Sequence, residues 1–159
     1  MADARFRRAG RANRRGRDMI LSIPYETPSK KNSRVINRRT GRSFPSKAYR
    51  EWHENASLWL KVHYNLAPQG DGPFMLRIRF YHGTNARCDS DNKVSSILDL
   101  LVDLGVLPDD RWQVVQNISV SNFYEKGHPS VQIGIFPLTD AVQAGPKVDK
   151  EKSIDYISP

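Results

Sequence analysis

The chain has a single cysteine and no long apolar run. Because Cys88 is alone among the 159 residues, the sequence excludes an internal disulfide and a zinc site built from cysteines. No stretch of about eighteen apolar residues occurs, so no membrane-spanning helix is expected. The N-terminus also lacks the apolar stretch of a secretory signal, which favours an intracellular protein.

Acidic residues are scarce in the first third of the chain. Residues 1–50 carry fifteen Lys or Arg against three Asp or Glu, whereas residues 51–159 carry ten against fourteen. Clustered cations bind polyanions because they displace counterions from a phosphate backbone. The alternative is a charged run that only keeps the protein soluble. Basic residues also recur beyond the N-terminal arm, and this second run favours a polyanionic partner.

The distribution of apolar residues predicts one folded domain with two polar ends. A length of 159 residues favours a single domain. Residues 1–18 contain seven arginines and almost no apolar side chains, so we expect a disordered basic arm. Residues 19–138 are predicted to form the domain, and the polar residues 139–159 a flexible tail.

Apolar periodicity predicts an α/β domain with a small mixed sheet and two helices. Strands are predicted at residues 19–23, 74–80, 112–121 and 130–136. The first helix is expected to start at a Ser46 cap and end near residue 65. The second is expected over residues 92–104, with Gly105 placed to end it. The order β-α-β-α-β-β favours helices packed on a mixed sheet.

A long polar loop is predicted between the first strand and the first helix. It runs over residues 24–45 and contains three prolines and Gly41. An unstructured connection of that length inside a compact domain is usually functional or disordered. Its charge favours a functional role. The basic residues of this loop are Lys30, Lys31, Arg34, Arg38, Arg39 and Arg42.

The most informative segment is Arg87-Cys88-Asp89-Ser90-Asp91-Asn92-Lys93, between a predicted strand and a predicted helix. If residues 89–91 are extended, both carboxylates point to one side, with Cα atoms about 6.5–7 Å apart. Such carboxylates could share a divalent cation, and Mg²⁺ suits them because it prefers oxygen ligands and keeps waters for a substrate phosphate. The alternative is that Asp91 only caps the helix. That interpretation leaves the nearby like charge of Asp89 unexplained.

A second acidic pair, Asp109-Asp110, follows the second predicted helix. The end of this helix lies about 20 Å from its start, and residues 105–110 would span that gap only if nearly extended. The spacing therefore permits a third metal ligand from the same chain without requiring it. A partner subunit could supply that ligand instead. A polar turn before a strand is the simpler interpretation of the pair alone.

Three motifs occur in a fixed order along the predicted domain, covering roughly residues 19–136. The first is Ile23-Pro24-Tyr25 followed by Pro28-Ser29-Lys30-Lys31-Asn32. The second is Arg87 before Asp89-Ser90-Asp91-Asn92, followed by Ile97-Leu98-Asp99-Leu100-Leu101. The third is Gly105 with Asp109-Asp110 and Val114-Val115. In these motifs and their order the chain resembles the RusA family of Holliday-junction resolvases.

The resemblance implies a RusA-like fold and a homodimer that binds four-way DNA junctions and nicks two strands symmetrically in recombination and repair. It also implies Mg²⁺ held by three aspartates, which map onto Asp89, Asp91 and Asp110. No membrane and no small-molecule cofactor are expected, and the default location is the cytoplasm of a bacterium, as a host or phage protein. The expected DNA-binding residues are Lys30, Lys31, Asn32, Arg34, Arg38, Arg39, Arg42 and Arg87.

One position departs from the family pattern. The family uses a catalytic lysine four residues beyond the second aspartate, where this chain has Ser95. Lys93, two residues beyond Asp91, is the candidate that stabilises the phosphate charge, with Lys30 or Lys31 as substitutes. The departure keeps two alternatives open: a non-catalytic DNA-binding protein of the same fold, and a nuclease for other branched or single-stranded DNA.

Overall fold

The computed structural model describes residues 18–29, 34–86 and 89–138. Almost all of the predicted basic arm and the whole predicted tail lie outside these ranges. Within them the elements are β1 Met19–Ile23, β2 Arg34–Ile36, β3 Ser43–Pro45, α1 Lys47–His63, β4 Phe74–His82, α2 Ser90–Asp103, β5 Val115–Tyr124 and β6 Ser130–Pro137. The predicted α/β class, with two helices and a small mixed sheet, is confirmed.

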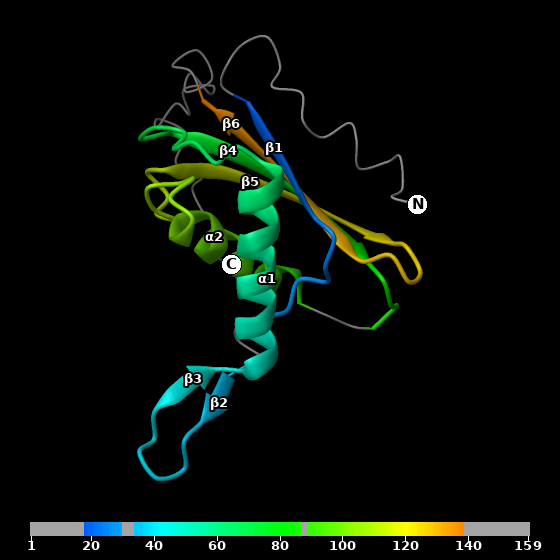
Figure 1. Ribbon diagram of the computed structural model, residues 1–159. Helices are drawn as coiled ribbons and strands as arrows, with labels where there is room; N and C mark the ends of the chain where they lie inside the picture. Colours follow the sequence, from blue (N-terminus) through cyan, green and yellow to red (C-terminus); the bar gives the residue numbers. More distant parts are fainter. Residues whose placement is uncertain (1–17, 30–33, 87–88, 139–159) are drawn as a thin grey trace, which may run out of the picture.

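Four strands form the main sheet in the order β1-β6-β4-β5 (Figure 1). β6 is antiparallel to both β1 and β4, whereas β4 and β5 are parallel and are joined through α2. Phe74 at the start of β4 faces Val115, and His82 at its end faces Tyr124. Residues that follow β4 therefore lie at the end of the sheet where β4 and β5 finish. Residues that precede β5 lie at the opposite end, where both strands begin.

The core lies between one face of this sheet and the two helices. The alternating residues Leu76 and Ile78 of β4 are fully buried, as the period of a half-buried strand predicts. Leu60 of α1 and Leu100 of α2 are fully buried as well. α1 begins where predicted, because the side chain of Ser46 accepts a hydrogen bond from the backbone N–H of Tyr49 at 3.1 Å.

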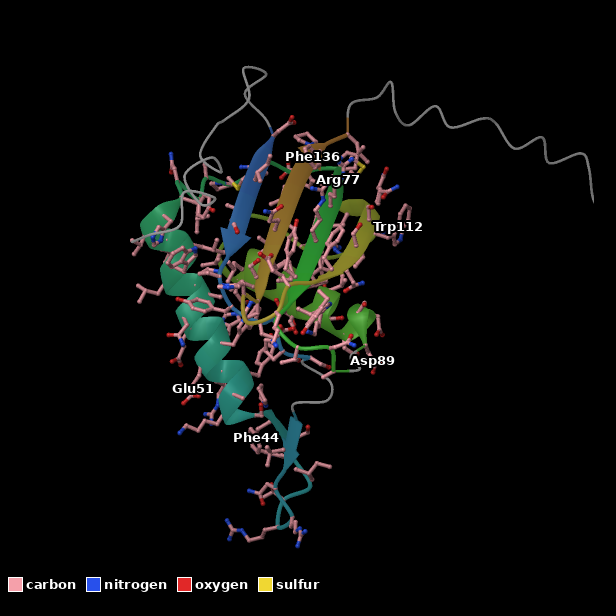
Figure 2. All side chains as sticks on the ribbon, turned by 90° about the vertical axis from the view of Figure 1, so that its right-hand side faces the viewer. Phe44, Glu51, Arg77, Asp89, Trp112 and Phe136 are labelled. Carbon is pink, nitrogen blue, oxygen red and sulfur yellow. The ribbon has the colours of Figure 1, made fainter. Side chains whose placement is uncertain are left out.

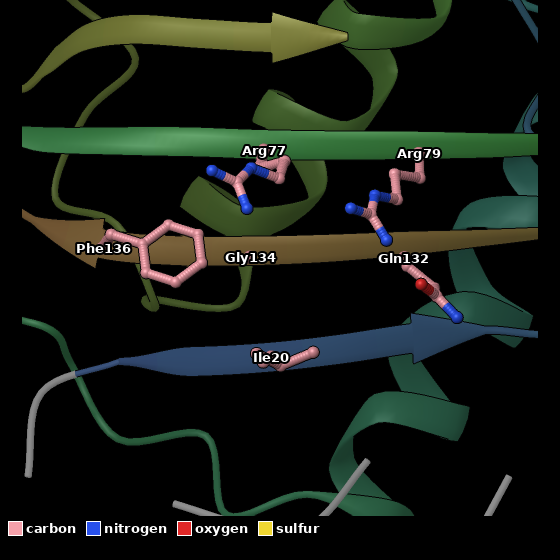
Figure 3. Close-up of a pocket in the computed structure, with 6 residues that line it drawn as sticks. All are labelled: Ile20, Arg77, Arg79, Gln132, Gly134 and Phe136. Carbon is pink, nitrogen blue, oxygen red and sulfur yellow. The ribbon is translucent and has the colours of Figure 1, made fainter. Parts of the chain in front are cut away.

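The opposite face of the sheet is open over the middle of β4 (Figure 3). A shallow hollow there is lined by Ile20, Arg77, Arg79, Gln132, Gly134 and Phe136. The guanidinium carbon of Arg77 lies 5.6 Å from the centre of the Phe136 ring, within the range of a cation–π contact. A Cβ atom at Gly134 would lie 2.6 Å from the same ring. A side chain at residue 134 would therefore require the Phe136 ring to move.

The prediction that residues 24–45 lack regular structure is wrong in part. β2 and β3 pair as an antiparallel hairpin that projects from the beginning of α1 (Figure 1). Its turn is closed by Asn37, whose side-chain oxygen accepts hydrogen bonds from the N–H groups of Arg39 and Thr40. Gly41 adopts a φ of +66°, which glycine tolerates without strain. The element order is thus β-β-β-α-β-α-β-β.

The third predicted strand also begins later than expected. Residues 111–114 form a turn, in which the N–H of Val114 donates to the carbonyl of Arg111 at 2.9 Å. β5 starts at Val115 and, among the described residues, is one of the two edge strands of the sheet. Because it has a neighbour on one side, Ile118 and Val120 remain 38% and 37% exposed. The alternating pattern alone does not predict this exposure, because it depends on the position of the strand in the sheet.

Candidate active site

Asp89 and Asp91 lie at the beginning of α2, at the end of the sheet where β4 and β5 finish. Asp89 occupies the N-cap position with an extended backbone, and Asp91 lies in the first turn of the helix. The helix therefore begins two residues earlier than predicted, and residues 89–91 do not form the extended segment considered above. Both aspartates are exposed. The peptide dipoles at a helix N-terminus stabilise negative charge there.

The carboxylate of Asp89 does not cap the helix and is held by Asn92 instead. Asp89 makes no side-chain capping hydrogen bond, and Nδ2 of Asn92 donates to its Oδ2 at 3.3 Å. Asn92 is 6% exposed, so this amide is fixed by its surroundings. At the position where the sequence resemblance implies a lysine, the hydroxyl of Ser95 donates to the backbone carbonyl of Asp91 at 3.2 Å. It supplies no positive charge.

Asp110 lies at the opposite end of the sheet, where β4 and β5 begin. The start of α2 is bound to the end of β5, because Nδ2 of Asn122 donates to the hydroxyl of Ser90 at 3.1 Å. Asn122 is seven residues beyond Val115, or about 23 Å along a strand. Asp110 precedes Val115, so it is about 20 Å or more from Asp89 in the same chain. In Figure 2, Trp112, two residues after Asp110, and Asp89 are labelled toward opposite ends of the sheet.

One chain therefore does not gather the three predicted aspartates. Among residues 18–29, 34–86 and 89–138, no group of three or more His, Cys, Asp or Glu side chains is close enough to hold a metal ion. The neighbouring Asp109 is committed to its own turn. It accepts from the backbone N–H of Arg111 at 3.0 Å and pairs with the Nε of that residue at 2.7 Å. These contacts hold the pKa of Asp109 below its ordinary value.

Lys93 is near the two aspartates in sequence, but its amine is buried. The residue is 5% exposed, its Nζ donates to Oε1 of Glu26, and it lies 3.4 Å from Nδ1 of His82. The structure thus places the predicted phosphate-stabilising amine in an ion pair with a carboxylate of the same chain.

Glu26, His82 and Asn122 were missed by the reasoning from sequence. Besides Lys93, the carboxylate of Glu26 meets Nδ1 of His82 at 3.1 Å and accepts from the N–H of Gly83 at 3.2 Å. Burial alone would raise the pKa of Glu26, but these hydrogen bonds hold it below its ordinary value. Nε2 of His82 is 2.9 Å from the side-chain oxygen of Asn122. A signal existed, since Glu26 is the single acidic residue between Asp18 and Glu51.

A family model for the endodeoxyribonuclease RusA matches residues 24–136. The match covers most of the chain and includes both aspartate-bearing segments. The chain belongs to the RusA endodeoxyribonuclease family. No curated protein matches it significantly. Membership makes the protein a nuclease, and the family implies Holliday-junction resolution and a branched DNA substrate.

The basic residues of this RusA-family nuclease are only partly described. Arg38, Arg39 and Arg42 lie in or beside the hairpin turn and are exposed. Arg34 begins β2. The hairpin extends beyond the end of the sheet at which Asp89 lies (Figure 2). The remaining predicted DNA-binding residues, Lys30, Lys31, Asn32 and Arg87, lie outside the described ranges.

The residues of one RusA-family chain suit a divalent cation in part. Asp89 and Asp91 offer two exposed carboxylates beside a helix N-terminus. Mg²⁺ is often held by one or two carboxylates together with waters and substrate phosphate. The donor set fits this pattern.

Within the described ranges, no helix is long and apolar enough to cross a membrane.

Proposed function

We propose that this protein is a Mg²⁺-dependent resolvase of four-way DNA junctions that works as a homodimer. Each metal site would combine Asp89 and Asp91 of one subunit with Asp110 of the partner subunit. One observation supports this arrangement. Asp110 precedes the start of β5, whereas Ser90 is bound near the end of β5. A dimer is the simplest assembly that restores a third carboxylate, and two-fold symmetry would generate two equivalent sites.

The edge strand β5 offers a surface on which two copies can meet. Its outer side lacks a strand partner among the described residues, and it exposes Ile118, Val120 and Phe123. Exposed apolar edge strands favour pairing with another chain. Antiparallel pairing about a two-fold axis at the middle of β5 would lay the beginning of one β5 beside the end of the other. Asp110 would thereby approach Asp89 of the partner subunit.

Each described residue then has a defined task. Asn92 holds Asp89, and the first turn of α2 holds Asp91. The exposed hairpin arginines Arg38, Arg39 and Arg42 hold the DNA backbone, and Lys30, Lys31, Asn32, Arg34 and Arg87 are proposed to extend this contact. When bound, Mg²⁺ would supply charge neutralisation of the scissile phosphate and a more acidic water.

Incubation of the protein with a labelled four-way junction, with and without Mg²⁺, tests the proposal. We expect paired nicks at symmetric positions that require the metal. A tight complex without nicks in Mg²⁺ or Mn²⁺ would instead leave a DNA-binding protein of this fold. Parallel reactions with flaps, three-way branches and single strands measure substrate selectivity, and faster cleavage of any of these would replace the four-way junction as the substrate.

A further inference from the structure

A charged lysine is enclosed at the beginning of α2. An ammonium group out of water is strongly destabilising unless it is paired. In this structure the Nζ of Lys93 has a carboxylate partner in Glu26, 67 residues away in sequence. The pair therefore joins the segment after β1 to the helix that carries Asp89 and Asp91.

Glu26 connects more than this one pair. Its Oε1 faces Lys93 and His82, and its Oε2 accepts from the backbone N–H of Gly83. Three segments meet at one carboxylate: the chain after β1, the end of β4 and the first turn of α2. The side chain of His82 continues to Asn122 of β5, which holds Ser90. The hydrogen-bonded chain thus returns to the residue between the two aspartates.

The segment containing Glu26 is also fixed at its next residues. The hydroxyl of Ser96 donates to the backbone carbonyl of Pro28 at 2.8 Å, and Thr27 is buried. Residues 26–28 are therefore bound along the first two turns of α2. This segment leads into the part of the chain that carries the basic hairpin.

We propose that Glu26 is a positioning residue for the metal-binding aspartates, and that Lys93 acts through Glu26 and does not contact the phosphate. The pair fixes the first turn of α2 relative to the ends of β4 and β5, and so sets the position of Asp89 and Asp91. This inference rests on the proposed function, in which these carboxylates bind the metal. Displacement of a catalytic group by about 1 Å can lower a rate by about a hundredfold.

A double-mutant cycle with Glu26→Gln, Lys93→Met and the double variant separates the two roles of Lys93. Each single change leaves one member of the pair unmatched, whereas the double change removes both charges together. We expect each single variant to lose cleavage rate by tenfold or more, on the order of the loss for a misplaced group, and to need more Mg²⁺ for half-maximal rate. The double variant should recover most of both. A double variant as inactive as Lys93→Met would assign Lys93 directly to the phosphate and overturn the proposal.

The matched control is the exposed pair Lys47 and Glu51, which are 3.5 Å apart on α1. Lys47→Met, Glu51→Gln and their combination should leave rate and metal dependence unchanged. Equal losses in this control cycle would mean that the effect of Glu26 is not specific to its position. Junction affinity measured in Ca²⁺ should be the same in both cycles, because neither pair is assigned to DNA contact.

Hydrogen–deuterium exchange of the peptide covering residues 89–96 gives a reading that does not depend on activity. We expect faster exchange in Glu26→Gln and a return to the wild-type rate in the double variant. Unchanged exchange in Glu26→Gln, at an unchanged melting temperature, would contradict the positioning role. If the wild type cleaves no junction in any divalent metal while the exchange pattern holds, the proposed function fails and the structural role of Glu26 stands. Glu26→Gln keeps an acceptor for Gly83, so it remains testable if Lys93→Met does not fold.

Discussion

The side-chain amide of Asn122 donates to the hydroxyl of Ser90 at 3.1 Å, and this contact ties the end of β5 to the start of α2. Ser90 lies between Asp89 and Asp91 in the chain, so the contact fixes both carboxylates at the end of the sheet where β5 finishes. The same contact shows why Asp110, which precedes β5, is distant from them within one chain. The site and the proposed dimer are therefore linked through one strand.

Replacement of Asn122 should disturb the site without removing a ligand. Asn122→Ala deletes the bond to Ser90 and the contact with His82. We expect a loss of about 1 kcal/mol in the free energy of unfolding because these hydrogen bonds are removed, measured by urea denaturation. The Mg²⁺ concentration for half-maximal cleavage should rise, while junction affinity in Ca²⁺ stays constant. A change in affinity alone would place Asn122 in DNA contact instead.

Asp89→Asn should abolish junction cleavage and leave junction binding intact or stronger. The change removes a negative charge near the scissile phosphate, so repulsion of the DNA falls while a metal ligand is lost. Single-turnover cleavage and a gel-shift titration measure the two effects separately. Asp71→Asn, in an exposed turn before β4, serves as the control of equal charge. Near wild-type metal-dependent cleavage by Asp89→Asn would remove Asp89 from the mechanism.

Neutralising the hairpin arginines should weaken junction binding through its salt dependence. For Arg38→Ala, Arg39→Ala and Arg42→Ala, we expect the slope of log affinity against log salt to fall by about 0.9 for each phosphate that the protein no longer neutralises. The cleavage rate at saturating DNA should change little, because these residues lie outside the acidic segment. Arg50→Ala on the exposed side of α1 is the control. An unchanged slope in all three hairpin variants would exclude the hairpin from the interface.

Glu26 predicts how stability depends on acid. Its folded pKa is lowered by its hydrogen bonds, so its contribution to stability is complete above the unfolded value of about 4.3 and is lost as pH falls through the folded pKa. The difference in free energy of unfolding between wild type and Glu26→Gln should therefore be largest near neutral pH and shrink below about pH 4. Urea denaturation at both pH values measures it. A difference that grows on acidification would contradict the lowered pKa.

The elements that the sequence predicted well have long, regular apolar patterns. The period-two pattern of β4 and the apolar stripe of α2 indicated both elements, with boundary errors of about two residues. The hairpin was missed because β2 and β3 have three residues each and little apolar content facing a core. The exposure of Ile118 and Val120 depends on strand order, which local patterns do not contain.

The site was predictable where its residues are close in sequence. Asp89 and Asp91 were found because two carboxylates two residues apart need an explanation. The partnership of Lys93 with Glu26 spans 67 residues, so spacing could not reveal it. The distance of Asp110 depended on whether residues 105–110 return along the helix. Because β4 and β5 are parallel, the chain returns to the start of β4 before β5 begins. Asp110 therefore lies at the opposite end of the sheet from Asp89 and Asp91.

Shared metal sites can be tested directly with mixed dimers. Asp89→Asn and Asp110→Asn should each be inactive as homodimers. In a dimer with one subunit of each kind, one site carries both substitutions and the other is intact, so the mixture, after co-expression or subunit exchange, should nick the junction. Such restored Mg²⁺-dependent nicking is the result that the account predicts. A mixed dimer, verified by mass, that stays as inactive as either homodimer would contradict it.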